Sequence, residues 1–170
     1  DAISHSVESL WSKRKTCESR EYALSALAFS EVAIESFKNG APDLTQFALA
    51  STYAGRAIAI SRTALAHSMS YPLTLTYEVP HGLACSFSLE AIFYFVRDSN
   101  SLQASEIRLI ELILHAIQPL RLGNRMTRYC DVNEAMQLVP DMIDTQRSSN
   151  MGVSLSPADL AESIHGSFAE

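Results

Sequence analysis

Apolar residues recur every three or four positions along almost the whole chain, and no segment shows sustained alternation of apolar and polar residues. The first spacing places apolar side chains on one face of an α-helix, whereas alternation would indicate a β-strand. A chain of 170 residues fits one domain. The pattern therefore predicts a single all-α domain over residues 1–170, a multi-helix bundle. We expect its helices at residues 2–13, 19–38, 42–70, 80–98, 101–120, 132–147 and from 156 onward.

The third of these helices is the central one, because its stretch 47–60 is apolar or small almost all round and lets neighbouring helices approach closely. We expect it to break at Tyr71-Pro72, since the residue before a proline is pushed out of helical geometry. Residues 72–79 would then form a short connection to the next helix. That connection is expected to fold back and bring His67 close to His81. Residues 123–130 are polar and are interpreted as a loop.

The charge and cysteine content exclude several classes of partner. The formal net charge is -6, and the 13 Lys and Arg residues are scattered, so no basic face is predicted for nucleic acid or for an anionic membrane surface. No apolar run reaches the roughly 18 residues that a membrane helix needs. The cysteines are odd in number and widely spaced, so they form neither a disulfide framework nor a CxxC metal site: Cys17, Cys85 and Cys130. These features favour a location in the reducing cytoplasm.

Two pairs of polar residues are candidate metal ligands. Asp1 and His5 are four positions apart and therefore share one helix face, although such a pair is more often a surface hydrogen bond. His67 and His81 flank the proline-bounded connection, although a histidine on an apolar helix is usually a core residue. Together they make a plausible four-ligand site. Nitrogen and oxygen ligands suit Fe(II) or Zn(II), and the affinity order does not decide between the two metals.

The remaining candidates take structural interpretations. Cys85 follows His81 by one turn, and we interpret it as a buried thiol rather than a fifth ligand. His115 and His165 are interpreted as structural or solvated. No GxGxxG segment or P-loop is present, so this chain has no motif of its own for cofactor phosphates.

Three stretches carry a family resemblance that covers essentially the whole chain. Residues 1–8 resemble the D-A-x-x-H-x-x-E segment of the iron-containing (group III) alcohol dehydrogenases, and residues 50–57 resemble their small-residue A-S-x-x-A-G-x-A helix. Residues 67–82 resemble the segment that supplies two further ligands. The resemblance implies the helical, dehydroquinate synthase-like domain of that family. It also implies four metal ligands: Asp1, His5, His67 and His81.

Tyr71 is the main departure from this family pattern. Many members have a histidine four residues after the third ligand, to which a proton relay is assigned, and Tyr71 occupies that position here. Its hydroxyl is the candidate catalytic proton donor, but its unperturbed pKa near 10 makes it a poorer shuttle at neutral pH than imidazole. A packed structural tyrosine is the alternative. The Tyr71-Pro72-Leu73 sequence resembles, more weakly, the branch that contains phosphonoacetaldehyde reductases.

The resemblance implies reversible hydride transfer between NAD(P) and a small alcohol or aldehyde, with the metal as a Lewis acid. The chain begins inside a predicted helix without a methionine, so we expect a fragment whose N-terminal nucleotide-binding domain is absent. That domain would bind NAD(P), and the fragment alone would be inactive. Two alternatives remain: the helical domain of a glycerol dehydrogenase or dehydroquinate synthase, and a helical interaction module in which the histidines are incidental.

The expected domain interface gives a further prediction about association. Loss of a nucleotide-binding domain would expose apolar side chains around residues 67–81, and large apolar patches attract partners. The expected contributors are Tyr71, Leu73, Leu75 and Tyr77. We therefore expect a homo-oligomer or self-association through this face.

Overall fold

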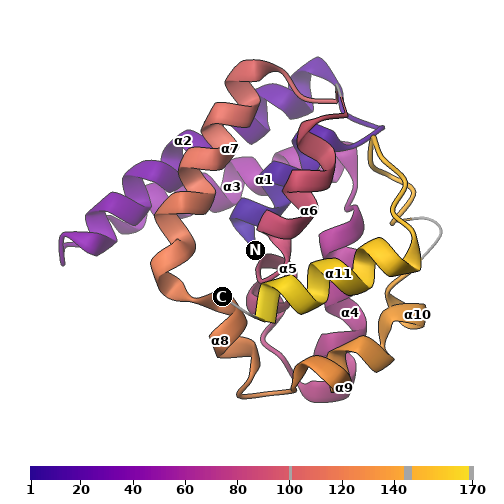
Figure 1. Cartoon of the computed structure of the whole chain (residues 1–170). Coiled ribbons are helices and arrows are strands. Elements are labelled where there is room, and N and C mark those ends of the chain that lie inside the picture. The colour runs from indigo at the N-terminus through magenta and orange to yellow at the C-terminus, as the bar shows by residue number, and fades with distance from the viewer. Residues whose placement is uncertain (100, 144–146, 169–170) are drawn as a thin grey trace.

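The computed structural model describes residues 1–99, 101–143 and 147–168. Within these residues all regular structure is helical, with no strand, which confirms the all-α prediction (Figure 1). The described elements are α1 Ala2–Trp11, α2 Cys17–Lys38, α3 Leu44–Ser61, α4 Leu65–Tyr77, α5 His81–Ser86, α6 Leu89–Arg97, α7 Ala104–Ile117, η1 Gln118–Leu120, α8 Leu122–Met126, α9 Val132–Gln137, α10 Val139–Met142 and α11 Pro157–Phe168.

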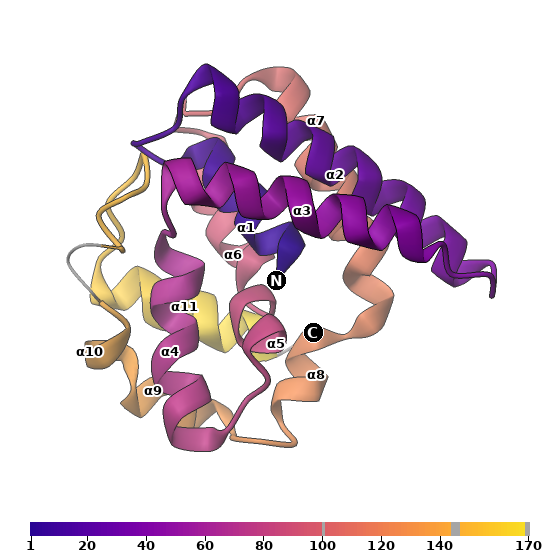
Figure 2. The ribbon, with the colours of Figure 1, turned by 180° about the vertical axis from the view of Figure 1, so that it is seen from behind.

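Helix α1 lies at the centre of the molecule and positions the site described below. It packs against the long antiparallel pair α2 and α3 and also contacts the starts of α4 and α5 (Figures 1 and 2). Its apolar residues Val7, Leu10 and Trp11 are fully or almost fully buried. Helix α11 crosses the other side of the molecule and packs against α6, α8 and α9. None of the described helices combines the length and apolarity needed to cross a bilayer.

The expected continuous helix at residues 42–70 is wrong, because the structure divides it into α3 and α4 with a break at residues 62–64. Arg62 has a positive φ of 64° and ends α3. The buried Asn150 side chain donates to the carbonyl oxygens of Ser61, Arg62 and Thr63 at 2.9, 3.3 and 3.1 Å. A side chain from the far end of the sequence therefore satisfies the carbonyl of the last residue of α3 and the two carbonyls that follow it, and the local apolar pattern gives no sign of it.

The expected break at Tyr71-Pro72 is also wrong, because α4 continues through Pro72 to Tyr77. A proline inside a helix removes one hydrogen bond and typically costs about 3 kcal/mol. Here Pro72 and the adjacent Leu73 are buried, and Met69 one turn earlier is fully buried, so packing offsets that cost. The chain turns instead at Glu78, whose φ is 55°, and Pro80 begins the next helix.

Four further segments differ from the sequence predictions. Residues 80–98 form two helices, α5 and α6, and residues 101–120 form α7 followed by the 3-10 helix η1. The expected loop at 123–130 begins with most of α8. The expected helix at 132–147 is divided into α9 and α10, and residues 144–146 lie outside the described residues. The predicted helix from residue 156 agrees with α11.

Replacing Asn150 by alanine is expected to lower the free energy of unfolding by about 0.5–2 kcal/mol, the usual effect of removing a helix cap. The variant would leave the carbonyls of Ser61, Arg62 and Thr63, at the break after α3, without their side-chain donor. Urea denaturation monitored by circular dichroism measures the change. The control is Asn124→Ala, at an exposed position, which should stay within about 0.5 kcal/mol of the wild type. Equal stability of the two variants would contradict the capping role.

Candidate metal centre

The four residues predicted as ligands lie together where α1, α4 and α5 begin. Asp1 precedes α1, His67 lies in the first turn of α4, and His81 is the first residue of α5. The Oδ1 atom of Asp1 is 3.5 Å from Nε2 of His5, 3.3 Å from Nε2 of His67 and 3.7 Å from Nε2 of His81. The expected proximity of His67 and His81 is confirmed, with ring centroids 5.5 Å apart. The turn that produces it lies at residues 78–80 rather than at Pro72.

Cys85 also belongs to this cluster, which the sequence interpretation did not expect. One ligand atom each from Asp1, His67, His81 and Cys85 lies within 4.8 Å of all the others. The Cys85 sulfur is 3.5 Å from Nε2 of His81, one helical turn away. His5 lies outside that group of four, and its ring stacks on the His67 ring with centroids 4.6 Å apart and an interplanar angle of 8°. The spacing of four between His81 and Cys85 is the sequence signal for this proximity.

Glu8 holds the start of α4 in place from inside the core. Its side chain is fully buried, and its carboxylate accepts from the backbone N–H groups of Ala64, Ala66 and His67 at 2.9, 2.6 and 3.3 Å. Ala64 offers no side-chain cap of its own, so Glu8 satisfies the free amides of the first turn. Asp1, His5 and Glu8 follow the spacing of one helix face, and a carboxylate on that buried face is the signal that could have shown its role.

The same carboxylate orients the His67 ring. Nδ1 of His67 lies 2.7 Å from Oε2 of Glu8, and a carboxylate can only accept, so the proton of this hydrogen bond belongs to Nδ1. Nε2 is thereby directed towards Asp1. In metal sites a carboxylate commonly fixes the tautomer and orientation of a ligand histidine in this way. The donor set of carboxylate oxygen and imidazole nitrogen therefore fits a divalent cation such as Fe(II) or Zn(II).

The three histidines of the cluster differ in the direction in which their pKa is shifted. Burial and the neighbouring positive charge of His67 lower the pKa of His5 to about 4. Burial also lowers the pKa of His81. Burial opposes protonation of His67 as well, but hydrogen bonds with Cys85 and Glu8 and the charge of Glu8 outweigh it and raise the pKa of His67 to about 10. The positive charge of the cluster is thus concentrated on His67, between the carboxylates of Asp1 and Glu8.

Tyr71 lies beside the cluster. Its ring centroid is 6.0 Å from that of His81, and its side chain is 38% exposed. The guanidinium carbon of Arg147 lies 4.7 Å from the centroid of the Tyr71 ring, in cation–π geometry. The expected apolar face around residues 67–81 is only partly present: Leu75 is 82% exposed, but Leu73 is fully buried because α4 continues through it.

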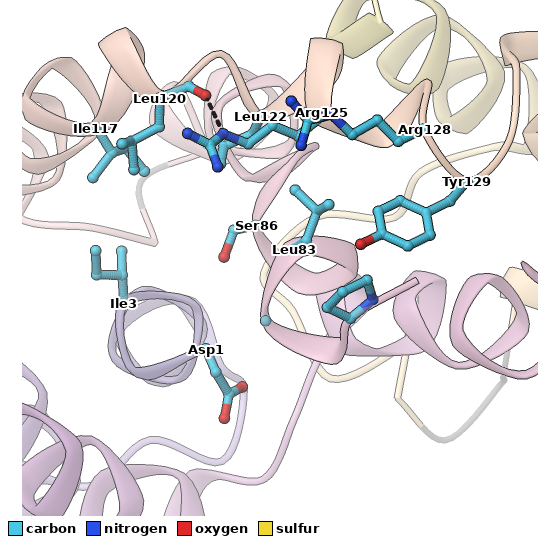
Figure 3. Close-up of a pocket in the computed structure, with 12 residues that line it drawn as sticks. Asp1, Ile3, Leu83, Ser86, Ile117, Leu120, Leu122, Arg125, Arg128 and Tyr129 are labelled. Atoms are coloured by element: carbon cyan, nitrogen blue, oxygen red, sulfur yellow. Dashed lines mark hydrogen bonds between the residues drawn. The ribbon is translucent and has the colours of Figure 1, made fainter. Parts of the chain in front are cut away.

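A cavity of about 440 Å³ adjoins the cluster at Asp1 (Figure 3). Pro80 and Gly82, on either side of His81, line it together with Asp1. Of the four candidate ligands, only Asp1 itself lines this cavity. Its remaining lining residues come from α1, α5, α7, η1, α8 and the turn after α8.

The fold and the cluster define a class: a helical domain with carboxylate, imidazole and thiol groups gathered at one point beside a cavity. The family model described as "Fe-containing alcohol dehydrogenase family, C-terminal" matches residues 1–160. The chain therefore belongs to the iron-containing alcohol dehydrogenase family and matches its C-terminal region, as its sequence resemblance implies.

One curated relative and two solved structures are similar to this chain. A phosphonoacetaldehyde reductase of Streptomyces viridochromogenes is 39% identical over 92 residues, which are 52% of this chain and 23% of that protein. The iron-containing alcohol dehydrogenase of Thermococcus thioreducens has a similar structure, with a TM-score of 0.78 at 20% identity, covering 99% of this chain and 49% of that one. The sulfoacetaldehyde reductase of Bifidobacterium kashiwanohense, solved with NAD+, has a TM-score of 0.75 at 22% identity, covering 99% and 48%. The chain thus spans about half the length of these solved structures, whose likeness shows a common fold.

Proposed function

We propose that this chain is the metal-binding half of an NAD(P)-dependent alcohol dehydrogenase or aldehyde reductase that acts on a small alcohol or aldehyde. Asp1, His5, His67 and His81 would hold one Fe(II) or Zn(II) ion. The observation that carries the proposal is the convergence of three imidazole Nε2 atoms within 3.3–3.7 Å of one carboxylate oxygen. A helical interaction module with incidental histidines would have no reason to assemble this donor set.

Each residue of the cluster has a distinct part in this proposal. A divalent metal bound there supplies a Lewis acid for the oxygen of the alcohol or aldehyde. Glu8 keeps Nε2 of His67 directed towards Asp1 through its hydrogen bond to Nδ1. Tyr71, beside His81, is the candidate proton donor. The nicotinamide cofactor would be bound mainly by the nucleotide-binding half of the longer protein, since this chain has no glycine-rich phosphate motif.

Two of the relatives favour the aldehyde-reductase form of this proposal. By name they reduce phosphonoacetaldehyde and sulfoacetaldehyde, both small aldehydes that carry an oxyanion. The match to the iron-type family model favours an iron-type alcohol dehydrogenase or aldehyde reductase over a glycerol dehydrogenase or dehydroquinate synthase.

Metal binding by the chain itself tests the proposal. We expect the wild type to bind one Zn(II) or Fe(II) per chain, and metal at 100 times its Kd to raise the free energy of unfolding by about 2.7 kcal/mol. His67→Ala should abolish this stabilisation, because it removes the most buried of the imidazole ligands. Thermal unfolding with and without metal, together with elemental analysis, measures both quantities. His165→Ala, at an exposed position on α11, is the matched control and should respond as the wild type does.

Two further variants test whether His5 or Cys85 is the fourth metal ligand. The proposal expects His5→Ala to weaken Co(II) binding and Cys85→Ser to leave it nearly unchanged. A thiolate ligand would give the Co(II) complex a sulfur-to-metal charge-transfer band in the near ultraviolet, and the wild type should lack it. A chain that takes up no stoichiometric metal, or a His67→Ala variant stabilised as strongly as the wild type, would contradict the proposal.

A further inference from the structure

The cavity beside Asp1 has two ends of different character (Figure 3). Asp1, from the candidate metal cluster, lies at one end. Arg125 and Arg128 line the opposite side together with Tyr129, from α8 and the turn that follows it. The walls between are mainly apolar: Ile3, Leu83, Ile117, Leu120 and Leu122. A volume of about 440 Å³ is within the usual range for small-molecule sites.

Arg125 and Arg128 are exposed side chains that line the same wall of the cavity. The chain carries a net charge of -6, yet no ion pair found among residues 1–99, 101–143 and 147–168 involves Arg125 or Arg128. Arg125 donates through Nε to the carbonyl oxygen of Leu120 at 2.7 Å. This hydrogen bond restrains the guanidinium and leaves its terminal N–H groups available. Restrained guanidinium groups bind phosphate-like and carboxylate oxygens well, because their planar array of donors matches those anions.

We propose that Arg125 and Arg128 bind a terminal oxyanion of the substrate, such as a phosphonate or a sulfonate, while its alcohol or aldehyde oxygen lies at the Asp1 end. This inference rests on the proposed function for the alcohol or aldehyde group of the substrate. It adds the two arginines as the residues that recognise the anionic group at the substrate's other end. A small molecule is favoured over the phosphates of a nicotinamide cofactor, because one cavity contains both the candidate metal ligand and the arginines. The substrate class is thus a short alcohol or aldehyde with an anionic terminal group.

Binding to the zinc-loaded chain tests the inference without any turnover. We expect 2-hydroxyethylsulfonate to bind at least roughly tenfold more tightly than 1-propanol, since a hydrogen bond to a charged group contributes about that much. The double variant Arg125→Gln/Arg128→Gln should lose this preference. Arg108→Gln removes the same charge from an exposed position on α7 and should keep it. NMR titration monitors the backbone amides of Gly82 and α8, and the spectra also report whether each variant is folded.

Three results would overturn the inference: no preference for the sulfonate in the wild type, an unchanged preference in the double variant, or a double variant that loses affinity for NADP+ alone. The last would assign the arginines to the cofactor. Inorganic sulfate, titrated into the metal-free chain, tests the arginines independently of the metal. Zinc content measured on the same samples separates the two proposals. If the chain takes up no zinc but still binds sulfate through the arginines, the proposed function is refuted and the anion site is kept. If the chain takes up zinc but shows no preference for the anion, only the anion site is refuted.

Discussion

Replacing Glu8 by alanine is expected to lower the free energy of unfolding by about 3–5 kcal/mol, as removal of one member of a buried ion pair does. The buried carboxylate accepts from three backbone amides and from the His67 ring, and its loss would leave all four donors without their partner. Metal affinity should fall as well, by roughly 10–100-fold, because the His67 ring would lose the contact that orients it. Chemical denaturation of the metal-free chain and a competition titration with a chelator measure the two effects.

Two variants make the Glu8 prediction specific. Glu21→Ala removes a carboxylate from an exposed position on α2 and should change stability by no more than about 0.5 kcal/mol. Glu8→Gln keeps an acceptor oxygen for the amides, so it should fold more stably than Glu8→Ala and still bind metal more weakly than the wild type. A Glu8→Ala variant with the stability of Glu21→Ala would show that the hydrogen bonds to α4 contribute little.

Gly123→Ala is expected to lower the free energy of unfolding by about 3 kcal/mol, the upper end of the usual cost of overpacking. A Cβ atom at residue 123 would collide with the backbone carbonyl of Ser167 in α11, and Cα of Phe168 would lie only 3.3 Å away. Backbone atoms on both sides cannot rotate out of the way, so α8 would have to move. Because α8 carries Arg125, the variant should also weaken anion binding in the adjoining cavity.

Gly55→Ala is the matched control for this substitution. No atom lies within 4 Å of the position that its Cβ would occupy on α3, so alanine should stabilise the helix there by roughly 0.5–1 kcal/mol. Thermal or urea unfolding of the two variants compares the same chemical change at a crowded and at an open position. A loss of stability in both would indicate that the effect of Gly123→Ala does not arise from the contact with α11.

The helical class and the meeting of Asp1, His5, His67 and His81 could be predicted from the sequence, because helix spacing and the family resemblance are properties of the chain itself. The turn that brings them together lies at residues 78–80 and not at Pro72, where the sequence predicts it. Proline propensity predicted a break at Pro72, whereas burial of the surrounding residues keeps α4 helical there. The real break at 62–64 depends on Asn150, nearly ninety residues away, and no local pattern contains that partner.

Cys85 and the arginines illustrate a second limit of sequence interpretation. A thiol one turn after a histidine is equally consistent with a core residue, and only the fold shows that its sulfur lies 3.5 Å from the His81 ring. Residues 123–130 contain few apolar positions, a pattern that predicts a loop. Their short helix α8 is held against α11 through the close approach at Gly123, which brings Arg125 to the cavity.

Residues from both ends of the chain stabilise the break between α3 and α4 by hydrogen bonds. Glu8 binds its α4 side, while Asn150 binds its α3 side and also accepts from the hydroxyl of Ser12. A ribosome-bound chain that has emerged only as far as Cys85 contains every candidate ligand and Glu8 but lacks Asn150. Because such long-range contacts form late, we expect a nascent chain to bind the proposed metal only after nearly the whole domain has left the ribosome.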